Sequence, residues 1–153
     1  MKKLNAKPYT PPESAEQISA VQWARQYCRL KGIDMLYAVP NQIPLHGHPN
    51  KWGVINWLKA MGLTKGVPDL VLASAHGHWH GLYLETKARG HTESSLSPEQ
   101  KRWRERLTEE GYLHKTWERA DEFRQIVEAY LRLPRTCVIH DARPLDEEKE
   151  MED

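Results

Sequence analysis

Hydrophobic and polar positions along this chain alternate between helical spacing and strand spacing. Apolar residues recur every three or four positions in four segments, which is typical of amphipathic helices, and we expect these helices at residues 14–31, 51–61, 97–110 and 120–133. Short and almost uniformly apolar runs lie between them and favour strands at residues 35–39, 70–73, 82–86 and 112–117. This order of elements predicts an α/β (α+β) fold in which helices flank a mixed sheet.

Residue types at two of the expected helix starts support these boundaries. Ser14 with Gln17, and Ser97 with Gln100, have the spacing of a capping box. In that motif two side chains and two backbone N–H groups satisfy each other at a helix start. Pro98 also suits the first position of its helix, because proline has no N–H that would be left unpaired there.

Length, composition and charge indicate one globular domain with a basic body. The chain has 153 residues, of which 39% are hydrophobic and 28% are charged, as is usual for a globular protein. We expect a flexible leader over residues 1–12, a single domain over 13–140 and an acidic, disordered tail over 141–153. The tail holds seven acidic and two basic residues, so the net charge of +1 divides into −5 for the tail and +6 for the rest. A basic body suits a polyanionic partner such as nucleic acid.

The sequence carries no membrane or export signal that we can identify. No apolar run approaches the 18 or so residues that span a bilayer, and the first residues lack the apolar core of a secretory signal. Cys28 and Cys137 lie far apart in different kinds of element, which does not imply a disulfide and fits a reducing cytosol. We therefore expect a cytoplasmic protein without a membrane partner.

The strongest chemical signal lies in residues 68–87, where two expected strands are joined by a tight hairpin. Asp69 opens the first strand, and Glu85 and Lys87 close the second. In an antiparallel pair the start of one strand lies beside the end of the next, so we expect the three side chains to converge at one end of the sheet. Residues 85 and 87 share a face, because side chains alternate along a strand.

Two carboxylates and an ammonium group on rigid strands are the parts of a site for phosphodiester hydrolysis. Mg²⁺ prefers oxygen ligands, and Mg²⁺ or Mn²⁺ held by carboxylates can activate water and neutralise charge on the phosphate. Asp69 and Glu85 would supply side-chain oxygens, and the backbone carbonyl of Thr86 would supply another. Lys87 would orient or help deprotonate the attacking water, or neutralise the phosphate.

Asp69 after Pro68, followed by Glu85-Thr86-Lys87 at the end of the next strand, resembles the PD-(D/E)xK nuclease superfamily. More closely, four ordered motifs are similar to the virus-type replication-repair nuclease (VRR-NUC) family: Gly66-Val-Pro-Asp-Leu-Val-Leu72, Leu84-Glu-Thr-Lys-Ala88, Leu96-Ser-Pro-Glu-Gln100, and Leu107 to Gly111-Tyr112. The similarity covers roughly residues 14–133. It implies a restriction-endonuclease-like αβββαβ core and a metal-dependent DNA nuclease.

The resemblance also implies roles for residues outside the hairpin. A further acidic metal ligand is expected on the first helix, with Glu16 as the best match and Glu13 as the alternative. For both, a favourable first-turn charge next to the helix dipole is the competing interpretation. Gln100 matches a position close to the metal site and can serve in its capping box at the same time. Asn41 lies where family members carry a Pro-Asn pair, so we expect it to line the site or contact DNA.

Basic residues near the motifs are candidates for contacts with DNA phosphates, which position DNA without reading its sequence: Lys65, Arg89, Lys101, Arg102 and Arg104. Selectivity would then come from DNA shape, such as branches, flaps or junctions in replication, repair or recombination. Stand-alone members of the family resemble proteins of viruses and mobile elements, which implies action in bacterial or virus-infected cells. We expect a homodimer, because one small domain presents little surface for gripping two duplex arms.

The histidines leave another interpretation open. His76, His78 and His80 alternate in the hairpin turn, and His46 and His48 share a loop. Such spacing can bind Zn²⁺, as in a zinc-binding interaction protein. The competing interpretation is an exposed polar hairpin that touches DNA.

Two further questions also stay open in the sequence. Most of the six tryptophans fit core positions, whereas Trp52, Trp79 and Trp103 suit either packing or contact with nucleic acid. A non-catalytic DNA-binding module on the same fold is the second alternative function. The complete set of Asp69, Glu85 and Lys87 argues against it.

Overall fold

The computed structural model describes residues 12–40, 47, 49–88, 90 and 95–136, and the predicted order of elements is confirmed. The elements are α1 (Pro12–Leu30), β1 (Leu36–Ala38), α2 (Lys51–Ala60), β2 (Leu70–Leu72), β3 (Leu82–Thr86), α3 (Pro98–Glu109), β4 (Leu113–Trp117) and α4 (Ala120–Arg132). None of the helices in these ranges is long and apolar enough to cross a lipid bilayer. The predicted leader and the predicted acidic tail lie outside the described residues, except for Pro12.

The strands form one mixed sheet in the order β1-β2-β3-β4, as expected. β1 pairs antiparallel with β2, and β2 pairs antiparallel with β3. β3 and β4 are parallel, which requires a crossover connection, and α3 provides it. Without α2, which is inserted between β1 and β2, the chain has the predicted αβββαβ core.

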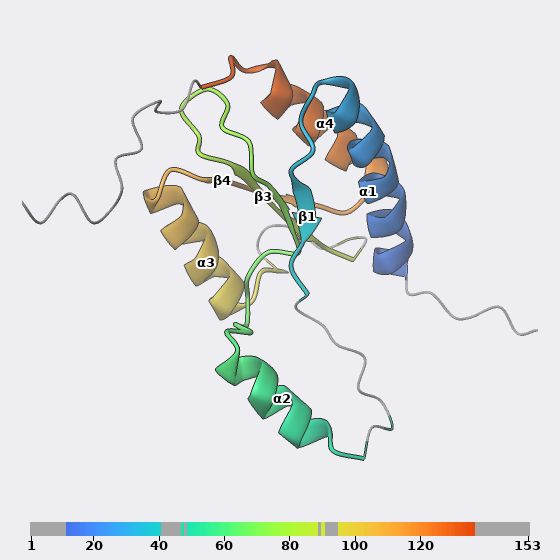
Figure 1. Ribbon diagram of the computed structural model, residues 1–153, viewed down its shortest axis with the longest axis vertical. Helices are drawn as coiled ribbons and strands as arrows, with labels where there is room; N and C mark the ends of the chain where they lie inside the picture. The colour runs from blue at the N-terminus through green and yellow to red at the C-terminus, as the bar shows by residue number, and fades with distance from the viewer. Residues whose placement is uncertain (1–11, 41–46, 48, 89, 91–94, 137–153) are drawn as a thin grey trace, which may run out of the picture.

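Helices cover both faces of the sheet, and the main core lies under α1 and α4 (Figure 1). Alternate strand residues on this face, such as Leu70, Leu84 and Trp117, are almost fully buried. α1 contributes the small residues Ala20 and Ala24, which allow the helix to approach closely. α4 contributes an apolar stripe at helical spacing: Phe123, Val127, Tyr130 and Leu131.

α3 packs on the opposite face against β4, and its start is the capping box that the sequence predicts. The backbone N–H of Gln100 donates to Ser97 Oγ over 3.2 Å, and Ser97 N–H donates to Gln100 Oε1 over 3.0 Å. The predicted box at Ser14 is not placed as expected, because α1 begins earlier, at Pro12. Helix ends of this kind shift by one or two residues with small changes in hydrogen bonding.

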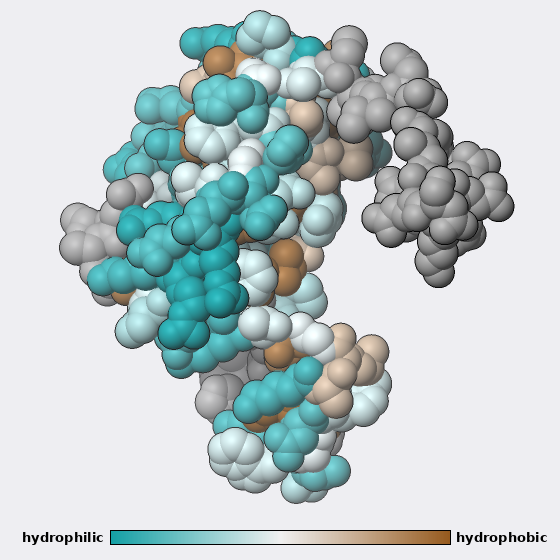
Figure 2. All heavy atoms as spheres, turned by 90° about the vertical axis from the view of Figure 1, so that its left-hand side faces the viewer, coloured by the Kyte–Doolittle hydropathy of each residue, from teal (hydrophilic) through white to brown (hydrophobic). Residues whose placement is uncertain are grey.

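α2 stands apart from the sheet, as a separate lobe at the lower end of the molecule (Figures 1 and 2). None of its residues is buried. Trp57 is 59% exposed, so the assignment of most tryptophans to the core is wrong for this one. Trp52, which the sequence left open between packing and contact with nucleic acid, is 73% exposed. Apolar residues at helical spacing predict that a helix forms, but they do not predict that other elements of the same chain bury its apolar side chains.

Candidate active site

The paired strands β2 and β3 bring Asp69 and Glu85 to the same end of the sheet, as predicted. Leu70 pairs with Leu84, so Asp69 and Glu85 are the next residues beyond this pair. Asp69 Oδ2 accepts a 2.8 Å hydrogen bond from the backbone N–H of Thr86. This bond extends the link between the strands past the last paired residues and fixes the Asp69 carboxylate.

Lys87 is fixed from two directions at the end of β3. Its backbone N–H donates to the Trp117 carbonyl over 2.8 Å, which prolongs the pairing with β4. Its ammonium lies 3.4 Å from Glu85 Oε1, and both side chains are largely buried. The two residues therefore share one face, as the alternation of side chains predicts.

Gln100 completes the cluster from α3. Its carbonyl oxygen accepts a 2.7 Å hydrogen bond from the Lys87 ammonium, and its amide nitrogen donates to Glu85 Oε1. The same carbonyl oxygen accepts from Ser97 in the capping box. The capping interaction and the contact with Glu85 and Lys87 hold together, which the sequence left as an option.

Glu85 is a carboxyl group with unusual electrostatics. Only 4% of the residue is exposed. Burial, with the nearby negative charge of Asp69, raises the pKa of Glu85 to about 7, and Lys87 and Gln100 only partly oppose this effect. Strongly shifted carboxyl groups of this kind concentrate at functional sites.

This pair of carboxylates fits a hard divalent cation. Burial and then the charge of Asp69 raise the Glu85 pKa, and a cation between Asp69 and Glu85 would relieve the second of these effects. Both residues offer oxygen ligands, and Mg²⁺ keeps several waters, so few protein ligands are needed. Within the described residues, no set of three acidic, histidine or cysteine side chains comes together as a metal-binding group. The predicted roles of Asp69, Glu85 and the Thr86 carbonyl as ligands stay predictions.

Glu16, the expected further ligand, contacts a different element. Its Oε2 accepts a 2.9 Å hydrogen bond from the backbone N–H of Ala120, at the start of α4. A carboxylate at that position satisfies a free helix N–H and interacts favourably with the helix dipole. β4 ends at Trp117, beside the end of β3, so Glu16 lies toward the same end of the sheet. The side chain of the alternative, Glu13, lies outside the described residues.

The candidates for DNA contact lie in different surroundings. Lys65 is exposed and forms a 2.9 Å ion pair with Glu99. Lys101 and Arg102 are exposed on the first half of α3, and Arg104 is half-buried one turn beyond Gln100. Asn41 and Arg89 lie outside the described residues.

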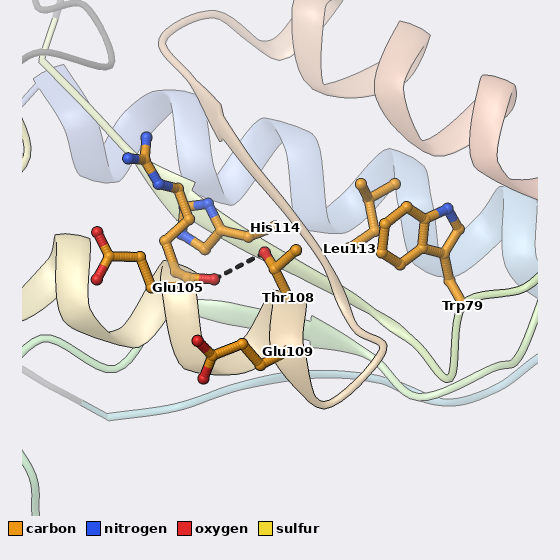
Figure 3. A pocket seen from close by; sticks show the side chains of 7 residues that line it. Trp79, Glu105, Thr108, Glu109, Leu113 and His114 are labelled. Carbon is orange, nitrogen blue, oxygen red and sulfur yellow. Dashed lines mark hydrogen bonds between the residues drawn. The ribbon is translucent and has the colours of Figure 1, made fainter.

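A groove continues from Arg104 along α3 and β4, and no pattern in the sequence indicates it. It has a volume of about 430 Å³ and is lined by Trp79, Arg104, Glu105, Thr108, Glu109, Leu113 and His114 (Figure 3). His114 is buried, and among the described residues neither ring nitrogen has a hydrogen-bond partner. Burial, with the charges of Arg104, Lys115 and Lys87, lowers the pKa of His114 to about 4. The sequence indicates only a strand here.

The three histidines of the hairpin turn make packing and hydrogen-bonding contacts within the fold. His76 is buried, and its Nδ1 lies 3.0 Å from the Leu133 carbonyl. His78 lies against its neighbour Trp79 with the two rings tilted, and His80 packs against Tyr112. These three histidines do not form a metal-binding group within the described part of the chain. His46 and His48 lie outside that part.

The fold is that of a nuclease-family domain. A solved structure described as a VRR_NUC domain protein is similar to this chain, with a TM-score of 0.64 and 22% sequence identity. The match covers 87% of this chain and 98% of that one. No curated protein matches the chain.

The family model of the VRR-NUC domain matches residues 10–133. The chain belongs to the VRR-NUC family, as its motifs predict.

Proposed function

We propose that this chain is a divalent-metal-dependent DNA nuclease that hydrolyses phosphodiester bonds, with preference for branched DNA in replication, repair or recombination. The observation that carries the proposal is the cluster of Asp69, Glu85 and Lys87 at one end of β2 and β3. Two acids and a lysine, held at the ends of paired strands, suit phosphodiester chemistry better than simple binding, which needs no buried carboxylate.

Each residue of the cluster has a role in this proposal. Asp69 and Glu85 would hold Mg²⁺ or Mn²⁺ through carboxylate oxygens, with the Thr86 carbonyl. When bound, the cation would activate the attacking water and neutralise charge on the phosphate. Lys87 is held by Gln100 at 2.7 Å, which keeps its ammonium in place to donate to the water or to a phosphate oxygen.

A cleavage panel tests the proposal directly. Labelled single-stranded, duplex, flap and four-way-junction DNAs are incubated with Mg²⁺ or Mn²⁺ and either wild type or Glu85→Ala. We expect the wild type to cut at least the branched DNAs and Glu85→Ala to lose cleavage by at least about 100-fold, as for loss of an essential catalytic contact. Glu110→Ala is the matched control, because Glu110 is an exposed acid at the far end of α3.

The same panel separates nuclease from binding module. Equal cleavage by wild type and Glu85→Ala would refute the assigned site. If the wild type binds these DNAs but cuts none of them with either metal, the chain is a binding module on a nuclease fold.

Glu16 is proposed as an additional metal ligand. Because Glu16 also accepts a hydrogen bond from the Ala120 N–H, the test must separate metal binding from stabilisation of α4. Glu16→Ala should weaken Mn²⁺ binding, measured by calorimetry on protein freed of metal. If the variant has a lower unfolding temperature but binds Mn²⁺ as the wild type does, Glu16 only stabilises the start of α4.

We also propose a homodimer, with the edge strand β1 as its contact. Among the described strands β1 ends the sheet and pairs on one side only, and the apolar side chains of Tyr37 in this strand and Met35 just before it are each about half exposed. Open edges and exposed apolar residues favour pairing with another chain. Light scattering should give twice the chain mass for the wild type and a smaller value for Tyr37→Lys. A monomeric wild type at micromolar concentration would refute the dimer.

A further inference from the structure

α2 carries an exposed aromatic and basic surface that the active site does not use. Trp52 is 73% exposed, and none of the ten residues of the helix is buried. From Met35 to Pro68 the chain contains three lysines and no acidic residue, and the two lysines of α2, Lys51 and Lys59, remain after Lys65 pairs with Glu99. A surface with this charge complements a polyanion and repels a second copy of itself.

The helical repeat divides the exposed side chains of α2 into two faces. At about 100° per residue, Lys59 lies within about 20° of Trp52 around the helix. The Lys51 ammonium lies 5.9 Å from the centroid of the Trp52 ring. Trp57 lies about 140° away from Trp52, and on that side its exposed neighbour is the apolar Met61. Only one face therefore combines a tryptophan with lysines.

The segment that follows α2 is attached to the start of α3, where Gln100 lies. Gly66, in the segment that leads from α2 to Asp69, packs so closely that an added Cβ would lie 2.7 Å from the Glu99 backbone. The adjacent Lys65 forms an ion pair with the Glu99 side chain, and this bond lowers the pKa of Glu99 to about 2. Glu99 directly precedes Gln100. The segment that follows α2 is thus anchored beside Gln100, and α2 lies beyond it at the lower end of the molecule (Figure 1).

We propose that Trp52, flanked by Lys51 and Lys59, stacks on an unpaired base of the DNA substrate near a branch point. This inference rests on the proposed nuclease function and names the element that selects branched DNA. Stacking on an aromatic side chain requires an exposed base face, which a branch offers and the interior of a duplex does not. The lysines neutralise the phosphates on either side of that base.

The test measures binding in EDTA, so that its outcome does not depend on cleavage. The 153-residue wild type and Trp52→Ala are titrated against a fluorescein-labelled four-way junction that carries unpaired bases at its branch point, and against a blunt duplex of equal length. We expect Trp52→Ala to weaken junction binding by about 5- to 150-fold, as for loss of one stacked base, and duplex binding by less than about threefold. Lys59→Ala should lower the salt dependence of log affinity by about 0.7 to 0.9.

Trp57→Ala is the matched control, because it removes an exposed tryptophan from the other face of the same helix. It should bind the junction within twofold of wild type. A second readout is independent of affinity: 2-aminopurine at unpaired positions near the branch should be quenched by saturating wild type and Trp57→Ala, but not by saturating Trp52→Ala. Circular dichroism checks that each variant keeps its helix content.

Three results would overturn the inference. One is junction affinity of Trp52→Ala equal to that of wild type. Another is an equal loss of junction affinity in Trp57→Ala, which would show that DNA binding does not distinguish the Trp52 face of α2 from the Trp57 face. The third is a change of molecular mass in Trp52→Ala, which would assign the face to a second copy of the chain. If junction binding follows the expected pattern but no DNA is cut with metal, the nuclease function fails and the stacking contact stands.

Discussion

Replacing Glu85 by glutamine should change how the stability of the metal-free protein depends on pH. Burial and the charge of Asp69 raise the pKa of Glu85 to about 7 from an ordinary value of 4.5. Between these two pH values the folded state binds more protons than the unfolded state, so the contribution of Glu85 to stability falls as pH rises. At about 1.4 kcal/mol per pH unit, this difference corresponds to about 3 kcal/mol.

Glutamine keeps the shape of the protonated carboxyl group and cannot ionise. Below pH 4.5 the two proteins should therefore have similar free energies of unfolding. Above pH 7 the Glu85→Gln variant should be more stable by up to about 3 kcal/mol. The comparison of variant with wild type at each pH removes the contributions of all other titrating groups.

Urea unfolding in EDTA, followed by circular dichroism from pH 4 to 8, measures this difference. Added Mg²⁺ should stabilise the wild type above pH 7, because a cation binds the ionised carboxylate, and should have little effect on Glu85→Gln. Glu110→Gln, at an exposed acid, should follow the wild type at every pH. Parallel stability curves for wild type and Glu85→Gln would refute the unfavourable burial of this charge.

Three further predictions concern the surroundings of the site. Burial lowers the pKa of His114 to about 4 from its ordinary 6.5, so the contribution of His114 to stability is present above pH 6.5 and is lost as pH falls toward 4. In the same unfolding assay, the His114→Leu variant should lose up to about 3 kcal/mol less stability than the wild type over this pH range. Gly66→Ala should destabilise the protein more than Gly62→Ala does, because both glycines have positive φ but of the two only Gly66 has a close neighbour. Equal losses of stability, near the roughly 1–2 kcal/mol of an alanine in the left-handed region, would show that the contact of Gly66 with Glu99 adds no cost. Ser97→Ala should cost about 1 kcal/mol and Ser97→Thr much less, as judged by thermal unfolding, and equal losses would contradict a capping role.

The part of the site that lies on the hairpin could be predicted from the sequence because local rules determine it. The antiparallel register and the alternation of side chains are enough to bring Asp69, Glu85 and Lys87 to one end. The capping box places Gln100 for the same reason, since four consecutive residues define it. The elements of the fold follow from equally local periodicity.

The features that could not be predicted depend on contacts between distant segments. Glu16 bonds to a backbone N–H 104 residues later in the chain, which no local pattern encodes. The exposure of α2 is similar, because an apolar helix has the same spacing whether its own chain or another molecule covers it. The burial of His114 depends on the packing of α3 against β4, and its sequence neighbours give no sign of it.

The Gln100 side chain has a consequence for anyone who would move this chemistry to another protein. Its single carbonyl oxygen accepts from both Ser97 and Lys87, while its amide nitrogen donates to Glu85. Glutamate at this position would place a second carboxylate against Glu85, and asparagine would be one methylene too short. The smallest portable unit is therefore discontinuous: the hairpin of residues 68–87 together with the helix start at 97–100, in their present relative orientation.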